Sequence, residues 1–303
     1  MARPNKKHHK IPRTYLEGFT DSEGRIWVAD ERLNLYPQKP KNILTENDYY
    51  TIRFESGGGT LDVETKLLNG IEGSYAQIYR DKVAVKGDIT EKEKAVLAVF
   101  VTSMMERQPM RRAALEDFFR QVKEYVTHMR GLPDKVKQNL AKMPNISSGE
   151  GIPADDLLKM GEDIGSLHTS LIPESIPELA PIIFNMKWAF LVRQDDAPLF
   201  LTSDKPFTMV NPVAEAEIGI GRIGSMPGLA QKDVEITLPL SSDVTLFCGW
   251  NMSHDCLYIP TTKAEVEDIN RRTQRHSRTL VAAEKALLEA TIARIKSRRQ
   301  KTD

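Results

Sequence analysis

Short apolar runs alternate with turn residues over the first sixty positions of the chain. Residues 25–30 (Arg-Ile-Trp-Val-Ala-Asp) follow an Asp-Ser-Glu-Gly turn at 21–24, and residues 49–54 alternate before Ser-Gly-Gly-Gly at 56–59. Alternation between turns is typical of half-buried strands. The pattern therefore predicts a small N-terminal β element over residues 1–60.

The next stretch has helical periodicity. Apolar residues recur at three- and four-residue steps over residues 61–83, which indicates an amphipathic helix. A capping box, Thr90 to Glu93, predicts the start of a second helix, which Pro109 should end or kink. With a further helical pattern over 110–129, these signals predict a helical region over residues 61–142.

A turn-rich stretch at 143–153 predicts a linker or flexible loop. Residues 155–168 fit a helix, and we expect Pro173, Pro177 and Pro181 to bracket a short segment after it. From residue 186 the pattern changes to short β runs between Pro, Gly, Asn and Asp, which predicts an antiparallel or mixed sheet over 186–260. The expected strands are 187–193, 199–203, 207–210, 234–240, 244–250 and 256–259.

A second capping box, Thr262 to Glu265, opens a predicted closing helix over residues 262–299. Its apolar stripe would either cover the protein's own core, which we slightly favour, or form a homodimer with a second copy. The stripe contains Leu280, Leu287, Leu288, Ile292 and Ile295.

Strands, then helices, then strands and a helix do not form the strict alternation of a Rossmann or barrel fold, so we predict the α+β class. The chain has 303 residues, enough for two average domains or one large one. We expect a single large domain over residues 1–303.

The charge of the chain is balanced, with 42 Lys and Arg against 42 Asp and Glu. This balance excludes a net electrostatic attraction of the whole protein to nucleic acid or acidic lipid, so any such attraction must come from a local patch. Both ends are basic, and if they lie together they offer a patch for nucleic acid, although solvated tails are the simpler interpretation. The cations are Arg3, Lys6, Lys7, Lys10 and Arg13 at one end and Arg294, Lys296, Arg298, Arg299 and Lys301 at the other.

The two cysteines, Cys248 and Cys256, flank a turn-like stretch. A hairpin disulfide is geometrically possible, but two unpaired thiols in a reducing cytoplasm are the expectation. The basic start lacks the apolar stretch of a secretory signal, and the longest apolar run, 95–101, is far too short to cross a bilayer. We therefore expect a cytoplasmic protein with no membrane partner.

Several motifs stand in a recognisable order. The chain opens with His-x-x-Pro-x-x-Tyr-Leu-x-x-Phe at 9–19 and continues with Gly-Arg-Ile-Trp-Val at 24–28. A helical Arg-Gln-Pro follows at 107–109, then Trp188, then Ser-Asp-Lys-Pro at 203–206. This order resembles Domain of Unknown Function family 4238, which is widespread in bacteria. The resemblance extends to about Tyr258, and the segment after about His276 is expected to be particular to this branch. It implies a fold group and a set of residues, and names no reaction.

Polar residues beside these turns and strand ends are the candidates for chemistry. Glu64 and Glu72 lie eight residues apart on the first predicted helix, about 80° apart around its axis. With His9 and Asp204 they would make an acid/base site, in which Arg107 binds a phosphate or carboxylate. The expected catalytic residues are His9, Glu64, Glu72, Arg107 and Asp204, and the expected substrate-binding residues are Tyr15, Ser203 and Arg111.

Each candidate also has a structural interpretation. Asp204 follows the strand at 199–203, where catalytic groups often lie, but Ser-Asp before x-Pro is also a common turn opener. Glu64 and Glu72 would be ordinary exposed carboxylates, and Arg107 would pair with one of these acids as structural support.

Motifs for other chemistries are weak. The glycines at 57–59 lack the Lys-Ser/Thr of a P-loop, and no Gly-x-Ser-x-Gly is present. His254 between the cysteines lacks a fourth zinc ligand. We predict no cofactor and assign no metal ligands, although carboxylate oxygens would suit Mg²⁺ or Mn²⁺.

Two functions fit these observations. One is a hydrolase acting on a phosphodiester or other phosphate-bearing substrate, with His9 or a carboxylate as general base. The alternative is a non-catalytic nucleic-acid or protein-binding module, including a phage-defence or toxin-type accessory protein, in which the same residues form a structural network.

Overall fold

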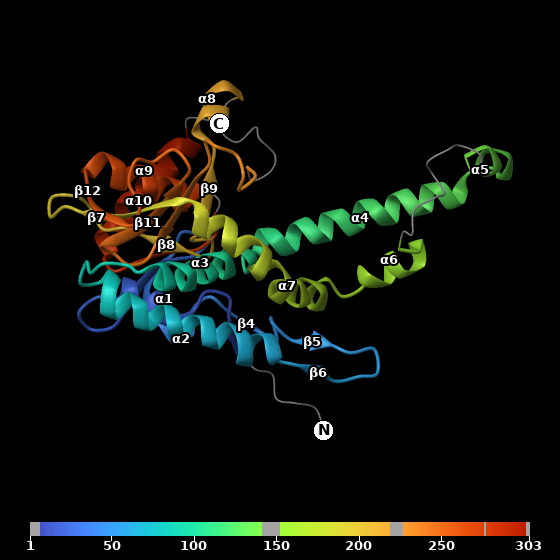
Figure 1. Cartoon of the computed structure of the whole chain (residues 1–303), viewed down its shortest axis with the longest axis horizontal. Helices are drawn as coiled ribbons and strands as arrows, with labels where there is room; N and C mark the ends of the chain where they lie inside the picture. The colour runs from blue at the N-terminus through green and yellow to red at the C-terminus, as the bar shows by residue number, and fades with distance from the viewer. Residues whose placement is uncertain (1–6, 141–151, 219–226, 276, 301–303) are drawn as a thin grey trace.

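Two β-sheets lie against a layer of helices, and one long helix projects away from them as an arm (Figure 1). The computed structural model describes residues 7–140, 152–218, 227–275 and 277–300. The arm consists of α4 (Pro109–Gly131) with α5 (Asp134–Leu140) at its far end and α6 (Ala154–Met160) alongside. The fold is α+β, as predicted. The linker predicted over 143–153 lies outside the described residues except at 152 and 153.

The N-terminal strands do not form a separate unit. A four-stranded antiparallel sheet has the order β3 (Leu35–Gln38), β2 (Ile26–Ala29), β13 (Leu280–Ala282), β8 (Thr202–Ser203). Its central pair therefore joins the two ends of the chain, and the predicted β element over 1–60 depends on a strand near the C-terminus. Two further ribbons are β1 (Lys7–His9) with β4 (Thr45–Asn47) and β5 (Ile52–Arg53) with β6 (Gly59–Thr60).

The second sheet contains five of the six strands predicted from residue 186 onward, and the sixth, predicted over 199–203, is β8 of the first sheet. The order of the second sheet is β12 (Leu257–Thr261), β7 (Lys187–Arg193), β11 (Val244–Gly249), β10 (Glu235–Pro239), β9 (Thr208–Val210). β12 and β7 are parallel and the other pairs are antiparallel, so the sheet is mixed. A short helix, α8 (Pro212–Ile218), follows β9.

The helical region begins with a continuous helix whose two ends are π-helical: η3 (Val63–Leu68), α2 (Asn69–Ile78) and η4 (Tyr79–Val83). The predicted capping box is present at the start of α3 (Glu91–Glu106), where Thr90 N donates to Glu93 Oε2 at 2.8 Å and Glu93 N donates to Thr90 Oγ1 at 3.3 Å. Three short helices precede these: α1 (Arg13–Leu16), η1 (Glu17–Phe19) and η2 (Pro40–Asn42).

The three prolines expected to bracket a short segment lie instead inside one helix, α7 (Ile164–Asn185). They recur at four-residue steps, so the hydrogen bonds that they remove fall along one side of the helix. Pro177 and Pro181 are exposed, while Ile172, Ile176, Ala180 and Ile183 are buried beside them. Packing of this apolar stripe, mainly against α3, outweighs the missing hydrogen bonds.

The predicted closing helix is interrupted. The second capping box is present, with Thr262 N donating to Glu265 Oε2 at 2.8 Å, and α9 (Lys263–Arg275) follows it. Leu280 then lies in β13 rather than on a helix, and α10 (Lys285–Arg299) comes after it. Leu288 and Ile292 of α10 are buried with Leu280, so this stripe covers the protein's own sheet.

The core lies between the helical layer and the sheets. Tyr75 of α2 stacks on Phe100 of α3 with ring centroids 3.7 Å apart, and Trp188 of β7 is fully buried. Gly18 is required at one close approach, since a Cβ there would lie 2.8 Å from Leu240 O. None of the helices in the described residues is long and apolar enough to span a bilayer.

Candidate active site

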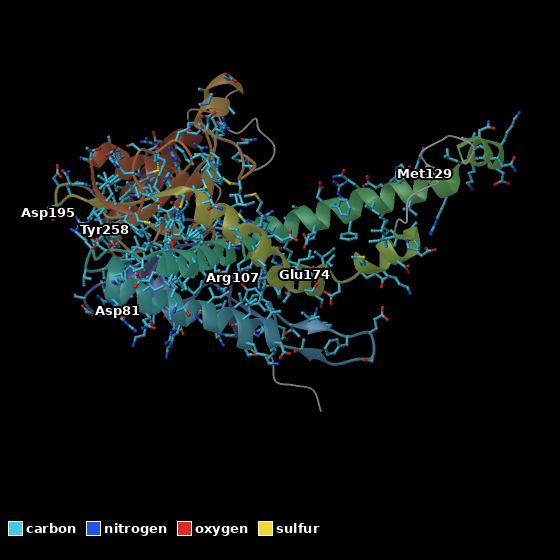
Figure 2. All side chains as sticks on the ribbon, viewed as in Figure 1. Asp81, Arg107, Met129, Glu174, Asp195 and Tyr258 are labelled. Carbon is cyan, nitrogen blue, oxygen red and sulfur yellow. The ribbon has the colours of Figure 1, made fainter. Side chains whose placement is uncertain are left out.

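A proline break in the helical layer places Arg107 in the interior. Arg107 follows the last residue of α3, and Pro109 begins α4. Because a proline disfavours helical backbone at the preceding residue, Gln108 is extended, with φ −63° and ψ 137°. The break turns the chain from the body into the arm, and Figure 2 shows Arg107 near the base of α4. Its side chain is fully buried.

Two acidic residues of the preceding helix balance this charge. Arg107 Nη2 donates to Glu72 Oε1 at 2.7 Å, and the Glu72 side chain is 17% exposed. Glu64, on η3, also interacts electrostatically with Arg107. The Arg107 guanidinium carbon lies 5.7 Å from the Tyr50 ring centroid, within the range of a cation–π contact.

His9 completes the cluster. It ends β1, opposite Thr45 of β4, and is half-buried. Burial lowers the pKa of His9 below 6.5, and the positive charges of Arg13 and Arg107 act in the same direction, while Glu72 opposes them. The imidazole is therefore neutral at pH 7 and able to accept a proton.

Three polar atoms of this cluster have no hydrogen-bond partner among the residues that the structure describes. They are His9 Nε2, Arg107 Nε and Arg107 Nη1, and all three are buried. Buried polar groups are nearly always hydrogen-bonded, so an unpaired set calls for an explanation such as a water or a ligand. An imidazole nitrogen and two guanidinium donors in electrostatic reach of one another would suit a negatively charged group and a nucleophile next to it.

The cluster does not fit a metal ion. No group of three His, Cys, Asp or Glu side chains is placed to hold one within the described ranges. Arg107 already supplies a positive charge that interacts with both Glu64 and Glu72, and a second cation there would be repelled. The Mg²⁺ or Mn²⁺ that carboxylates would suit is therefore not part of our proposal.

Tyr15 and Ser203 lie in the core. Tyr15 is fully buried, and its hydroxyl hydrogen-bonds to Thr202 Oγ1 at 2.7 Å. Ser203 is also fully buried, and its Oγ accepts a hydrogen bond from Lys205 N at 3.0 Å. These contacts tie α1 to β8 and close the turn after β8.

Asp204 lies at a different place from the Arg107 cluster. Its Oδ1 accepts hydrogen bonds from Arg278 N at 3.0 Å and Thr279 N at 3.2 Å. These bonds hold the turn after β8 to the segment that leads into β13. Asp204 also lines an open cavity with Lys10 and Arg278.

Arg111 belongs to a third group. Its Nη2 lies 2.7 Å from Glu106 Oε1, and burial raises the pKa of Glu106 although Arg111 opposes this shift. His168 of α7 has its Nε2 2.9 Å from Glu106 O, and burial lowers the pKa of His168.

Tyr50, His8 and the π-helical turn were not predicted from the sequence as parts of the site. Tyr50 N donates to His8 Nδ1 at 2.9 Å, which fixes β1 beside the cluster. Tyr50 belongs to the alternating run over 49–54, where its sequence context indicates only a buried strand position. Residue spacing does not reveal the wider turn of η3 either, yet π-helical turns are rare and often occur at functional sites.

Two described cations of the N-terminal basic patch, Lys10 and Arg13, are already paired. Lys10 Nζ lies 3.3 Å from Glu46 Oε2, and Arg13 Nε lies 3.2 Å from Glu17 Oε1. Arg3, Lys6 and Lys301 lie outside the described residues.

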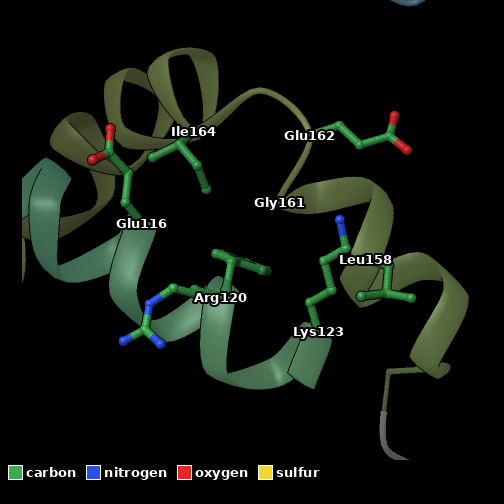
Figure 3. Close-up of a pocket in the computed structure, with 8 residues that line it drawn as sticks. Glu116, Arg120, Lys123, Leu158, Gly161, Glu162 and Ile164 are labelled. Carbon is green, nitrogen blue, oxygen red and sulfur yellow. The ribbon is translucent and has the colours of Figure 1, made fainter. Parts of the chain in front are cut away.

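A further cavity of about 510 Å³ lies on the arm, where α4 forms one wall and α6 with the turn into α7 forms the other (Figure 3). Its lining mixes Glu116 and Glu162 with Arg120 and Lys123. Gly161 fits closely there, because a Cβ would lie 2.8 Å from the Phe119 ring. We interpret this cavity as a gap left by the packing of α4 against α6 and do not assign it a ligand.

A family model described as Protein of unknown function (DUF4238) matches residues 7–286. The match passes Tyr258 and includes β13, so the expectation that the segment after about His276 departs from the family is wrong as far as residue 286. No curated protein and no solved structure matches the chain.

Proposed function

The chain belongs to the DUF4238 family of proteins of unknown function, and from the geometry of the Arg107 cluster we propose that it is a hydrolase of phosphate esters. The observation that carries the proposal is the set of three unpartnered buried atoms, His9 Nε2, Arg107 Nε and Arg107 Nη1. A neutral imidazole and an uncommitted guanidinium edge are the two groups that hydrolysis of a phosphate ester needs.

His9 acts as the general base. The substrate phosphoryl group accepts hydrogen bonds from Nε and Nη1 of Arg107, and these donors stabilise the negative charge on its oxygens in the transition state. A water molecule attacks phosphorus and gives its proton to His9 Nε2. The bond from phosphorus to the leaving oxygen breaks, that oxygen takes a proton from solvent, and His9 returns its proton to solvent.

Glu72 and Glu64 act as positioning residues in this scheme. Glu72 holds Arg107 Nη2 at 2.7 Å and leaves the other two nitrogens for the substrate. Glu64 lies within electrostatic reach of Arg107, and both carboxylates compensate the cost of burying a guanidinium. The Glu72 side chain is 17% exposed, so the carboxylate of the pair lies at the boundary between the interior and solvent.

The test is hydrolysis of bis(p-nitrophenyl) phosphate, p-nitrophenyl phosphate and a single-stranded oligonucleotide by the purified chain. We expect His9→Gln to lower kcat by roughly 100-fold or more, the usual contribution of a general base. The matched control is His128→Gln, at an exposed position of the arm, which should leave kcat unchanged. A chelator should also leave the rate unchanged, because Arg107 supplies the positive charge.

Hydrolysis that is equal in the wild type and in folded His9→Gln would contradict the proposal. So would the absence of hydrolysis of all three substrates by the wild type. Either result, together with lower stability of Glu72→Gln, would assign the cluster to the structural network of a non-catalytic module.

A further inference from the structure

We infer that the cavity beside Asp204 is a binding site for a phosphate ester of about nucleotide size. The cavity has a volume of about 500 Å³ and lies between the turn that joins β2 to β3 and the segment before β13. Its lining residues include three cations, Lys10, Arg32 and Arg278. This volume is within the range of small-molecule sites.

Two aspartate-anchored turns fix the backbone at Arg32 and Arg278. Asp30 Oδ1 accepts hydrogen bonds from Arg32 N and Asn34 N, both at 2.9 Å. Asp204 Oδ1 accepts from Arg278 N and Thr279 N. In each turn the aspartate bonds to the backbone of the residue that carries the guanidinium. Asp204 of the Ser-Asp motif lies outside the Arg107 cluster, and its role in this account is to fix the turn beside the cavity.

The lining holds three cations and three carboxylates, Asp30, Glu31 and Asp204, and Lys10 is paired with Glu46, so Arg32 and Arg278 are the cations that would bind an anion. Arg32 and Arg278 are exposed, and neither makes an ion pair with a carboxylate in the described part of the chain. The charges of Asp30 and Asp204 are directed at backbone amides through the bonds above, so they only partly offset the arginines. Arginine binds phosphate oxygens in a bidentate manner, and two arginines on facing turns suit a phosphate group.

A neighbouring cavity gives the size of the ligand. It has a volume of about 310 Å³ and shares Asp30, Glu31 and Arg278 with the first. Its own lining includes the apolar residues Leu33, Leu280 and Ile295. A polar cavity that shares lining residues with a partly apolar one suits a phosphate that carries an organic group better than it suits inorganic phosphate.

This inference does not depend on the proposed function, although Lys10 follows His9 directly in the chain. Binding at the cavity requires no hydrolysis, and it is measured in His9→Gln as well as in the wild type. Loss of hydrolysis with retained binding would leave the cavity site intact. Retained hydrolysis with no binding at the cavity would leave the proposed function intact.

The experiment is isothermal titration calorimetry of the full chain with AMP, ribose 5-phosphate and inorganic phosphate. We expect AMP or ribose 5-phosphate to bind at least 10-fold more tightly than inorganic phosphate. The double variant Arg32→Ala/Arg278→Ala should weaken that binding at least 10-fold, whereas Glu31→Gln should strengthen it because it removes a carboxylate from the lining. Arg120→Ala, on the arm, is the matched control and should change nothing.

Three results would overturn the inference. The first is no saturable binding of any of the three ligands. The second is equal affinity for inorganic phosphate and the two esters. The third is a double variant that binds as the wild type does, or an Arg120→Ala variant that loses as much affinity as the double variant.

Discussion

Arg107 Nη2 lies 2.7 Å from Glu72 Oε1, and none of the Arg107 side chain is exposed. The pair joins the end of α3 to the first turn of α2, the helix that precedes it in the chain. A buried guanidinium depends on its carboxylate, because an uncompensated charge in the interior is far more costly than a paired one. The contact therefore holds the helical layer together as well as orienting Arg107 in the cluster.

Replacing Glu72 by Gln should lower the free energy of unfolding by about 3 kcal/mol, the usual cost of removing one partner from a buried ion pair. Urea unfolding followed by circular dichroism measures this change. Glu178→Gln, at an exposed position of α7, should leave the unfolding midpoint unchanged. Equal midpoints for the two variants would show that Arg107 does not need Glu72.

The neutral state of His9 makes stability depend on pH. Burial lowers the pKa of His9 below 6.5, so the unfolded chain takes up this proton at a higher pH than the folded chain does. The resulting stability is present above pH 6.5 and is lost as the pH falls toward the folded pKa. His168 acts in the same direction, so only a comparison of variants isolates His9.

Urea midpoints of the wild type and of His9→Gln, measured between pH 5.5 and 8, test this prediction. The wild type should lose more stability than the variant as the pH falls. Parallel curves would mean that His9 has an ordinary pKa in the folded protein.

Gly18→Ala should destabilise the protein by roughly 1 to 3 kcal/mol, the usual cost of overpacking, because the new Cβ would lie 2.8 Å from Leu240 O. The control is Gly70→Ala on α2, where a Cβ meets nothing within 4 Å. Alanine favours a helix over glycine by up to about 1 kcal/mol, so this variant should be more stable than the wild type. Thermal unfolding of both variants measures the two shifts, and a Gly18→Ala variant as stable as Gly70→Ala would refute the close approach.

Cys248 and Cys256 should remain unpaired and slow to react. Strand β7 lies between them, since Cys248 faces Trp188 in the β11 ladder and Cys256 N donates to Trp188 O from the other side. Two strand spacings are about 10 Å, too far for a disulfide. Both thiols are free, as the sequence predicted, and the hairpin disulfide left open there is wrong.

Burial raises the pKa of Cys256 to about 11, and burial also raises the pKa of Cys248. Since the thiolate is the reactive form, alkylation by iodoacetamide at pH 8 should be at least about 10-fold slower in the folded protein than in urea. Mass spectrometry of the labelled protein measures both rates. Labelling of either thiol at the unfolded rate would contradict this packing.

Local signals in the sequence predicted much of the fold. Both capping boxes, the helix over 61–83 and the strands of the mixed sheet depend on neighbouring residues and are present. The pairing of β2 with β13 joins opposite ends of the chain, and no local pattern contains that information. Leu280 fits a helical stripe as well as a strand, and the tertiary partner decides between them.

Only part of the candidate site was predictable from the sequence. His9, Glu64, Glu72 and Arg107 carry charge or a titratable ring beside turns and helix ends, and the structure brings them together. Tyr50 contributes an aromatic face to the cluster, a role that its sequence context does not indicate. Asp204 lies on another surface because its turn pairs with the segment before β13, again through a contact distant in sequence.

The most direct test of the account is the pH dependence of kcat/KM for phosphate ester hydrolysis by the wild type. A general base with a lowered pKa predicts a rate that is constant near pH 7 and falls with an acidic limb below pH 6.5, and this limb should be absent from the residual rate of His9→Gln. A rate that persists unchanged in His9→Gln, or an acidic limb that the variant retains, would contradict the assignment of His9 as the base.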